Sequence, residues 1–236
     1  MSSSRRNGLV ILTSVRSLYL KIRVQHALAR AVTLGLTLAL AGCFTAQVFP
    51  TSQEHVISLR AGDLEASGIA FITPSSATGQ EEEKQALAMV FAEVFQKLRP
   101  AVRVIGLPES LNAINRAGLA EIYKQMYHDY RDTGLFKRDI LKRIGEVSGA
   151  RYLAQIKLQG FEQNAKERFG AFGFRIVETT FSSIRVFLQI WDSEDGTIAW
   201  EGMQETHISK DRIADKPVTL RQIAERTARD MVARLP

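Results

Sequence analysis

The alternation of apolar and polar residues in the second half of the chain is the feature that most limits its fold. Residues 183–191 (SIRVFLQIW) alternate for part of their length, and the turn 192–196 leads to a partner segment at 197–201. A period of two places successive side chains on opposite faces of a strand, and the Asp-Gly pair of the turn accommodates positive φ. Residues 151–158 alternate in the same way, so a β-meander is expected.

Residues 67–149 have helical periodicity between short apolar strands. Residues 69–72 predict a buried strand, and apolar residues spaced by three and four predict a helix that ends at Leu98. Residues 102–105 predict another strand, helices are expected up to Gly149, and a last helix follows Pro217. This order implies an α/β fold with helices packed on one mixed β-sheet.

An apolar run from Ala31 ends directly before the only cysteine of the chain, Cys43. A membrane-spanning helix needs about 20 apolar residues, whereas the apolar part of a secretory signal needs only about 7–15. The run ends in Leu40, Ala41, Gly42 and Cys43, which resembles the lipobox of bacterial lipoproteins. Residues 1–42 are therefore expected to be a lipoprotein signal peptide that is cleaved before Cys43.

Cys43 would then carry a diacylglycerol and an N-acyl chain, and no other cofactor is expected. The next residue is Phe44 and not the Asp that marks inner-membrane retention, which favours the periplasmic face of the outer membrane. In a source with one membrane, the anchor would lie in the cell membrane. Residues 43–66 lack clear periodicity and are expected to be the lipidated N-terminus and a flexible tether, with a periplasmic α/β domain at 67–236.

The net charge of +6 comes entirely from the predicted signal peptide. Residues 1–42 contain six Lys or Arg residues and no acidic residue, so 25 basic and 25 acidic residues remain after cleavage. A nucleic-acid-binding domain needs an excess of positive charge to hold phosphates. The expected partners are therefore the membrane, through the lipid, and an unidentified envelope protein, with no nucleic acid.

Three segments resemble a group of envelope lipoproteins and periplasmic domains. They are residues 68–74 (GIAFITP), 144–153 (IGEVSGARYL) and 186–200 (VFLQIWDSEDGTIAW). The group includes the curli-secretion lipoproteins (CsgG-like), the N-terminal domain of TolB, the polysaccharide-export lipoprotein PelC and the peptidoglycan-synthase activator LpoB. The resemblance implies an α/β sandwich that acts as an adaptor or as a homo-oligomeric ring module, and not as an enzyme.

A stretch with three phenylalanines, Phe169, Phe172 and Phe174, lies among glycines and between two arginines. Exposed apolar clusters mark interaction sites, so these rings are candidates for contact with a membrane or a partner. Two alternatives stay open: the rings pack beneath the sheet, or Gly170 and Gly173 only bend a long hairpin. Residues 161–181 are too few for two membrane-spanning hairpins, so the chain is not expected to form a pore itself.

No catalytic or metal-binding motif is found. His55, His128 and His207 lack partners at ligand spacing, and His128 and Asp129 are adjacent residues that point in different directions on a helix. No catalytic or metal-ligating residue is therefore predicted, and a hydrolase is the least favoured class. A glycan- or small-ligand-binding lipoprotein is the alternative function, with Tyr152, Trp191 and Trp200 as stacking surfaces or, equally, as core residues.

The lipobox makes a direct prediction about Cys43. Cys43→Ser removes the sulfur to which the lipid attaches, so the variant is expected to lose acylation and to keep its signal peptide. Incorporation of labelled fatty acid and the mass of the purified chain measure both effects. Acylation of the Cys43→Ser chain at wild-type level would exclude Cys43 as the lipid site.

Overall fold

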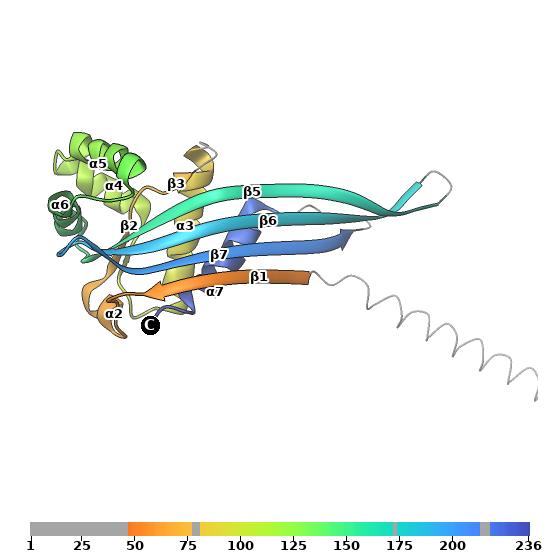
Figure 1. Ribbon diagram of the computed structural model, residues 1–236, viewed down its shortest axis with the longest axis horizontal. Helices are drawn as coiled ribbons and strands as arrows, with labels where there is room; N and C mark the ends of the chain where they lie inside the picture. The colour runs from red at the N-terminus through yellow and green to blue at the C-terminus, as the bar shows by residue number, and fades with distance from the viewer. Residues whose placement is uncertain (1–46, 77–80, 172–173, 213–217) are drawn as a thin grey trace, which may run out of the picture. The chain divides into compact units, whose positions relative to one another are not determined.

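A mixed β-sheet with helices packed against it forms the framework of the chain (Figure 1). The structure is a computed structural model that describes residues 47–76, 81–171, 174–212 and 218–236. In this part of the chain the sheet has seven strands, in the order β1-β7-β6-β5-β2-β4, with β3 paired to β5. The predicted α/β class with one mixed sheet is therefore confirmed.

The strands and helices follow one another in the order expected from the sequence, with additions near the N-terminus. The strands are β1 Gln47–Val56, β2 Ile69–Phe71, β3 Ser75–Ser76, β4 Val104–Ile105, β5 Tyr152–Ala171, β6 Phe174–Asp192 and β7 Thr197–Arg212. The helices are α2 Asp63–Ser67, α3 Glu81–Leu98, α4 Leu107–Arg116, α5 Ala120–Thr133, α6 Arg138–Ser148 and α7 Leu220–Val232.

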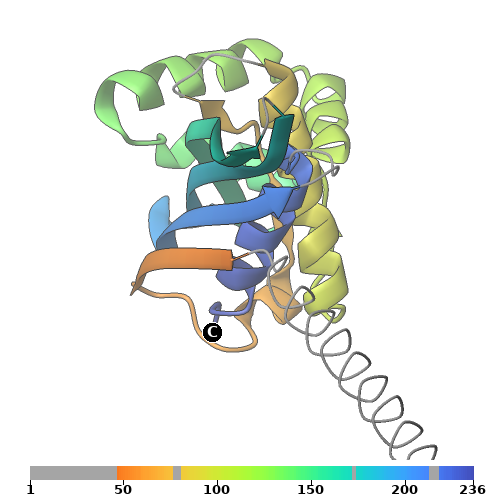
Figure 2. The ribbon, with the colours of Figure 1, turned by 90° about the vertical axis from the view of Figure 1, so that its right-hand side faces the viewer.

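One face of the sheet is covered by α3 and α7. The spacing of three and four puts Phe91 and Phe95 on the buried side of α3, where the ring of Phe95 meets that of Phe71 edge to face at 5.9 Å. The indole of Trp200 on β7 is fully buried in the same core. Figure 2, which faces the end of the sheet with the β5–β6 hairpin, shows α3 beside the strands.

The other face is covered by α4, α5 and α6 at one end of the sheet, over β2 and the adjoining ends of β5, β6 and β7. There Phe136 lies between two rings, stacked on Tyr130 at 4.3 Å and edge to face with Trp191 at 5.1 Å. Leu153 of β5 and Ile144 of α6 are fully buried in this second core. The sheet is thus buried on both faces at one end and on one face along the rest of its length.

Residues 47–56, assigned by the sequence to the tether at 43–66, instead form β1. The strand pairs with β7 from Gln47 opposite Ser209 to Val56 opposite Trp200, and Glu54 lies 3.1 Å from the guanidinium of Arg234. Almost all its side chains are exposed, so no buried face imposed a period of two on the sequence. Backbone hydrogen bonds to β7 hold it in place.

The strands of the meander are also longer than their alternating segments indicate. β5 and β6 continue in antiparallel register from Tyr152 opposite Asp192 to Ala171 opposite Phe174. After Leu158 on β5 and before Ile184 on β6, polar residues interrupt the apolar pattern of the sequence. The C-cap predicted at Gly149 is confirmed, with φ of 73° and a backbone hydrogen bond from its N–H to the carbonyl oxygen of Gly145.

A close contact between α6 and the β6–β7 turn yields a test of the packing. A Cβ atom at Gly145 would lie 2.8 Å from the Cβ of Ser193 and 3.0 Å from the carbonyl oxygen of Ala150. Gly145→Val is therefore expected to lower the free energy of unfolding by about 2 kcal/mol, measured by urea denaturation. Gly160→Val is the matched control, since nothing lies within 4 Å of a Cβ at that position. Equal stability of the two variants would contradict the contact.

Candidate functional site

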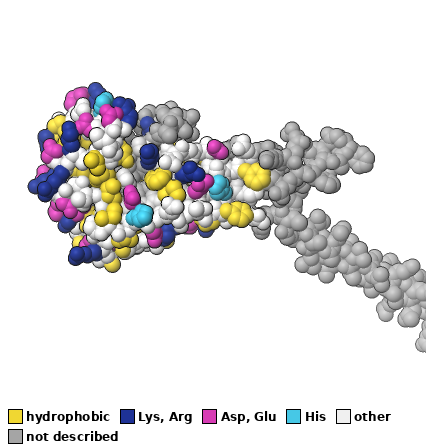
Figure 3. All heavy atoms as spheres, in the orientation of Figure 1, with side chains coloured by type: hydrophobic (Ala, Val, Ile, Leu, Met, Phe, Trp, Pro, Cys, Tyr) yellow, Lys and Arg dark blue, Asp and Glu magenta, His cyan; other side chains and the backbone are white. Residues whose placement is uncertain are grey.

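The long strands leave one sheet face open beyond the helices. On β6, Ile184, Val186 and Leu188 are buried against α3 and α7, so the residues between them point to the opposite side. Antiparallel register places their partners on β5, β7 and β1 on that same side. We call this side, away from α3 and α7 and beyond Gln155, the open face (Figure 3). Among the rows that cross all four strands, with side chains that the structure describes, the two nearest the hairpin tip are Asn164, Phe181, Ser209 and Gln47, and then Glu162, Ser183, His207 and Phe49.

A row of polar side chains separates the open face from the core beneath α5. The hydroxyl of Tyr130 donates to Oε1 of Gln189 at 3.2 Å, and Nε2 of Gln189 donates to Oε2 of Glu201 at 3.2 Å. In the same row, Nε2 of Gln155 donates to Oγ of Ser75 at 2.9 Å. These bonds satisfy the polar groups that α5 covers. The open face extends from this row toward the hairpin tip.

Charged groups pair with one another in the middle of the open face. Arg185 lies 2.6 Å from Glu205, and His207 lies 2.9 Å from the other oxygen of the same carboxylate. The hydrogen bond from Arg185 lowers the pKa of Glu205. These three side chains line a hollow of about 440 Å³ together with Lys157 and Glu162. The pairing leaves this region close to neutral and suited to contact rather than to acid–base chemistry.

Two phenylalanines give the open face an apolar region near the hairpin. The side chain of Phe49 is 57% exposed and that of Phe181 is 36% exposed. They line a second hollow of about 440 Å³ together with His207 and Ile208. Figure 3 shows hydrophobic and histidine side chains on this face beside the hairpin. Exposed rings grouped in this way are typical of an interaction surface.

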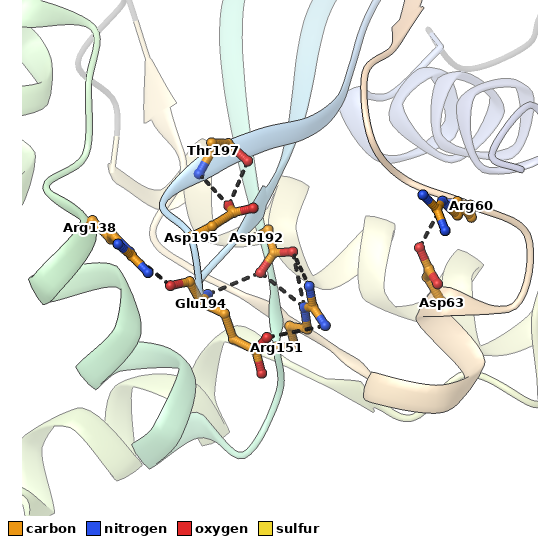
Figure 4. A network of polar contacts seen from close by, with 8 residues as sticks. All are labelled: Arg60, Asp63, Arg138, Arg151, Asp192, Glu194, Asp195 and Thr197. Atoms are coloured by element: carbon orange, nitrogen blue, oxygen red, sulfur yellow. Dashed lines mark hydrogen bonds and ion pairs between the residues drawn. The ribbon is translucent and has the colours of Figure 1, made fainter.

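The end of the sheet opposite the hairpin is closed by ion pairs (Figure 4). Nη2 of Arg151 lies 2.7 Å from the buried carboxylate of Asp192, and Nη1 lies 3.2 Å from Glu194. Nε of Arg138 donates to the backbone carbonyl of Glu194 at 3.0 Å. Because Asp192 and Glu194 both pair with Arg151, this network holds the β6–β7 turn in place.

The remaining candidates for chemistry are also separated by the fold. His128 lies 3.6 Å from Asp132, whereas Asp129 lies 2.6 Å from Lys137, so His128 and Asp129 have different partners. Within the described ranges, no group of His, Cys, Asp and Glu residues could hold a metal ion. In the same ranges, no helix has both the length and the apolar content to cross a membrane.

The three aromatic residues considered as stacking surfaces belong to the cores. Trp200 is fully buried, Trp191 is 1% exposed and Tyr152 is 3% exposed. The interpretation of these rings as a glycan-stacking surface is therefore wrong. A strand that is buried on at least one face needs large apolar side chains, and this accounts for the three aromatic residues in the sequence without a ligand.

Several predicted site residues fall outside what the structure describes. Cys43 and its lipobox, Leu40, Ala41 and Gly42, precede the described residues, as does the signal peptide. Phe172 lies outside them too, and only the backbone of Phe169 and Phe174 is described, paired within the β5–β6 hairpin. Lipidation at Cys43 and contact through these phenylalanines stay predictions.

The sequence analysis missed the residues that shape the open face. Arg185, Glu205 and His207 come from two strands, and Phe49 comes from a third strand that was assigned to a tether. The polar positions within residues 183–191 indicate one solvated face of a strand. Which residues lie beside them depends on register, which alternation alone does not specify.

Comparisons with known proteins give matches in structure only. No protein-family profile matches the chain, and no curated protein matches it by sequence. Among solved structures, the PelC dodecamer from Paraburkholderia phytofirmans has 10% identity and a TM-score of 0.42 over 81% of this chain and 97% of PelC. Lipoprotein GNA1162 from Neisseria meningitidis has 11% identity and a TM-score of 0.37 over 71% and 99% of the two chains.

The C-terminal domain of LpoB from Salmonella enterica is also similar, with 13% identity and a TM-score of 0.30 over 59% of this chain and 82% of that domain. At these values the backbones overlap only in part. The function proposed below is therefore based on the residues of this chain.

The burial of Tyr152 predicts how the protein responds to alkali. Burial raises its pKa to about 12, from an ordinary value of about 10. The folded chain keeps a proton that the unfolded chain releases, so this stabilisation is complete below about pH 10 and is lost as pH rises toward 12. Tyr152→Phe is expected to lessen the loss, measured by urea denaturation at several pH values. Ionisation of Tyr152 at its ordinary pKa in the folded protein, seen as tyrosinate absorbance missing from the variant, would contradict its burial.

Proposed function

We propose that this chain is a lipoprotein, anchored in the membrane through Cys43, that acts as a non-catalytic accessory of an envelope assembly or export system. The observation that carries the proposal is the open face. It combines paired charges with two exposed phenylalanines, and it lies on strands whose first member, β1, begins four residues after Cys43. An anchored domain with such a face is built to hold a partner beside a membrane.

The chemistry of the open face supports binding rather than catalysis. The carboxylate of Glu205 forms an ion pair with Arg185 and also contacts the imidazole of His207, so it is not poised to take up a proton. A general base needs a pKa near the working pH, whereas the pKa of Glu205 is lowered. The proposal therefore includes no enzymatic activity and no cofactor other than the lipid.

The edge of the sheet supports association with further copies or with an extended segment of a partner. β1 has ten residues, and in the described part of the chain its outer edge pairs with no strand. An unpaired edge presents backbone N–H and C=O groups to another chain. When the β1 edge of each copy contacts a different surface of the next copy, repeated head-to-tail contact can close a ring, which is the form of homo-oligomer proposed here.

The anchor and the hairpin complete the proposed arrangement. A diacylglycerol and an N-acyl chain on Cys43 provide more than one hydrophobic chain, as stable membrane binding requires. Phe44 favours delivery to the outer membrane, where the domain would face the periplasm. Phe169, Phe172 and Phe174, at or next to the turn of the β5–β6 hairpin, are proposed to contact the membrane or a partner.

Charge reversal on the open face tests partner binding. Arg185→Glu places two carboxylates side by side on β6 and β7, so it is expected to reduce recovery of cross-linked envelope partners at least tenfold, as loss of about 1.4 kcal/mol would. Quantitative mass spectrometry of material purified with the lipidated chain measures the recovery.

A second ion pair supplies the matched control. Arg221 on α7 lies 2.6 Å from Glu93 on α3, and both are exposed on the helical side of the sheet. Arg221→Glu is expected to leave partner recovery unchanged. Equal recovery with both variants would exclude the open face as the docking surface, and a strictly monomeric chain at high concentration would exclude the ring.

A further inference from the structure

The end of the sheet where β1 begins carries both polar groups and exposed aromatic rings. Gln47, the first described residue, lies in one row with Ser209, Phe181 and Asn164 across four strands. Phe49 stands in the next row. The amide and hydroxyl groups of this row and the two exposed rings therefore lie together at the edge where the chain enters the domain.

Chain length limits how far this end can lie from the proposed lipid. Gln47 follows Cys43 by four positions in the sequence. A fully extended chain spans at most about 3.6 Å per residue, so the Cα of Cys43 is at most about 14 Å from that of Gln47. The headgroup region on each side of a bilayer is about 5–7 Å thick. A lipid on Cys43 thus holds the Gln47 row close to the membrane surface.

The β5–β6 hairpin extends beyond this row at the end of the sheet where β1 begins (Figure 1). The first residue of β6, Phe174, precedes the row at Phe181 by seven positions, and this part of the strand pairs with β5 as far as Ala171. At about 3.3 Å per residue this is a length of about 23 Å. The hairpin backbone is therefore longer than the connection to Cys43, so the Gln47 row reaches the headgroup region only when the strands are tilted toward the membrane plane and the hairpin runs along the bilayer surface.

The side chains match the headgroup region better than the hydrocarbon. Phe49 and Phe181 offer apolar rings, while Gln47, Ser209 and Asn164 beside them carry polar groups that need hydrogen bonds. Burial of such groups in hydrocarbon without partners is costly, whereas the interface supplies water and lipid oxygens. A second copy of the chain would cover the rings equally well, but the short connection to Cys43 is specific to the membrane.

We infer that the end of the open face carrying Phe49 and Phe181 lies in the headgroup region of the leaflet that holds the Cys43 lipid. This inference rests on the proposed lipidation of Cys43. The lipid and the two rings then form separate points of contact, which fix the tilt of the domain and direct the middle of the open face, around Arg185, toward a partner beside the membrane.

Single-cysteine labelling of the full chain tests the contact. Cys43 is the only cysteine, so a lipidated chain has no free thiol. Phe49→Cys and Phe181→Cys chains, lipidated in a diderm host, are labelled with a polarity-sensitive fluorophore and placed in phosphatidylethanolamine–phosphatidylglycerol vesicles. The expected result is a blue shift and quenching by lipids with a nitroxide on the headgroup. Ser209→Cys reports on the same row if loss of a phenylalanine disturbs the fold.

Leu135→Cys is the matched control, because Leu135 is 63% exposed and lies between α5 and α6, at the end of the sheet away from the hairpin. Its fluorophore is expected to stay unshifted and unquenched. Emission at positions 49, 181 and 209 that matches position 135 would overturn the contact and leave the lipid anchor standing. Labelling of the wild-type chain at Cys43 would show that this thiol is free and would overturn both.

Discussion

The structure depends on β5, because this strand is buried on both faces where it begins and on one face farther along. Tyr152, Ala154 and Ile156 point into the core beneath α3 and α7, while Leu153 points into the core beneath α5 and α6. The same segment pairs in parallel with β2 and antiparallel with β6. Burial on both faces therefore joins the helical half of the chain to the meander, and the side left uncovered farther along becomes the open face.

The transition between these two environments occurs at a single row of polar groups. Gln155 is 1% exposed yet satisfies its amide through Ser75, and Gln189 beside it accepts from Tyr130. A buried amide without partners would cost about 1–3 kcal/mol, so the row is stable only with these bonds. This row thus closes the core beneath α5 with satisfied polar groups. Beyond it lies the open face, whose charged residues pair with each other.

The apolar end of the open face is consistent with the proposed lipid anchor. A sheet face with exposed phenylalanines and an unpaired edge favours unwanted association of a freely diffusing protein. Pro50 lies in β1, and proline, which lacks a backbone donor, is confined within sheets to edge strands, strand starts and bulges. With a lipid on Cys43 the apolar end of the face is directed to the bilayer, and a domain with balanced charge remains above it.

The sequence by itself determined the class of fold and most of the element order, and it predicts export of the chain. Alternation at 151–158 and 183–191, helical spacing before Leu98 and the apolar run before Cys43 are local signals, each produced by one element that meets one environment. Only the tertiary structure decided that Trp191 and Trp200 lie in cores and that residues 47–56 form a strand. It also brought Phe49, Phe181, Arg185 and Glu205 onto one face. Those outcomes depend on register and on what covers each strand, and both are set by contacts between residues far apart in the chain.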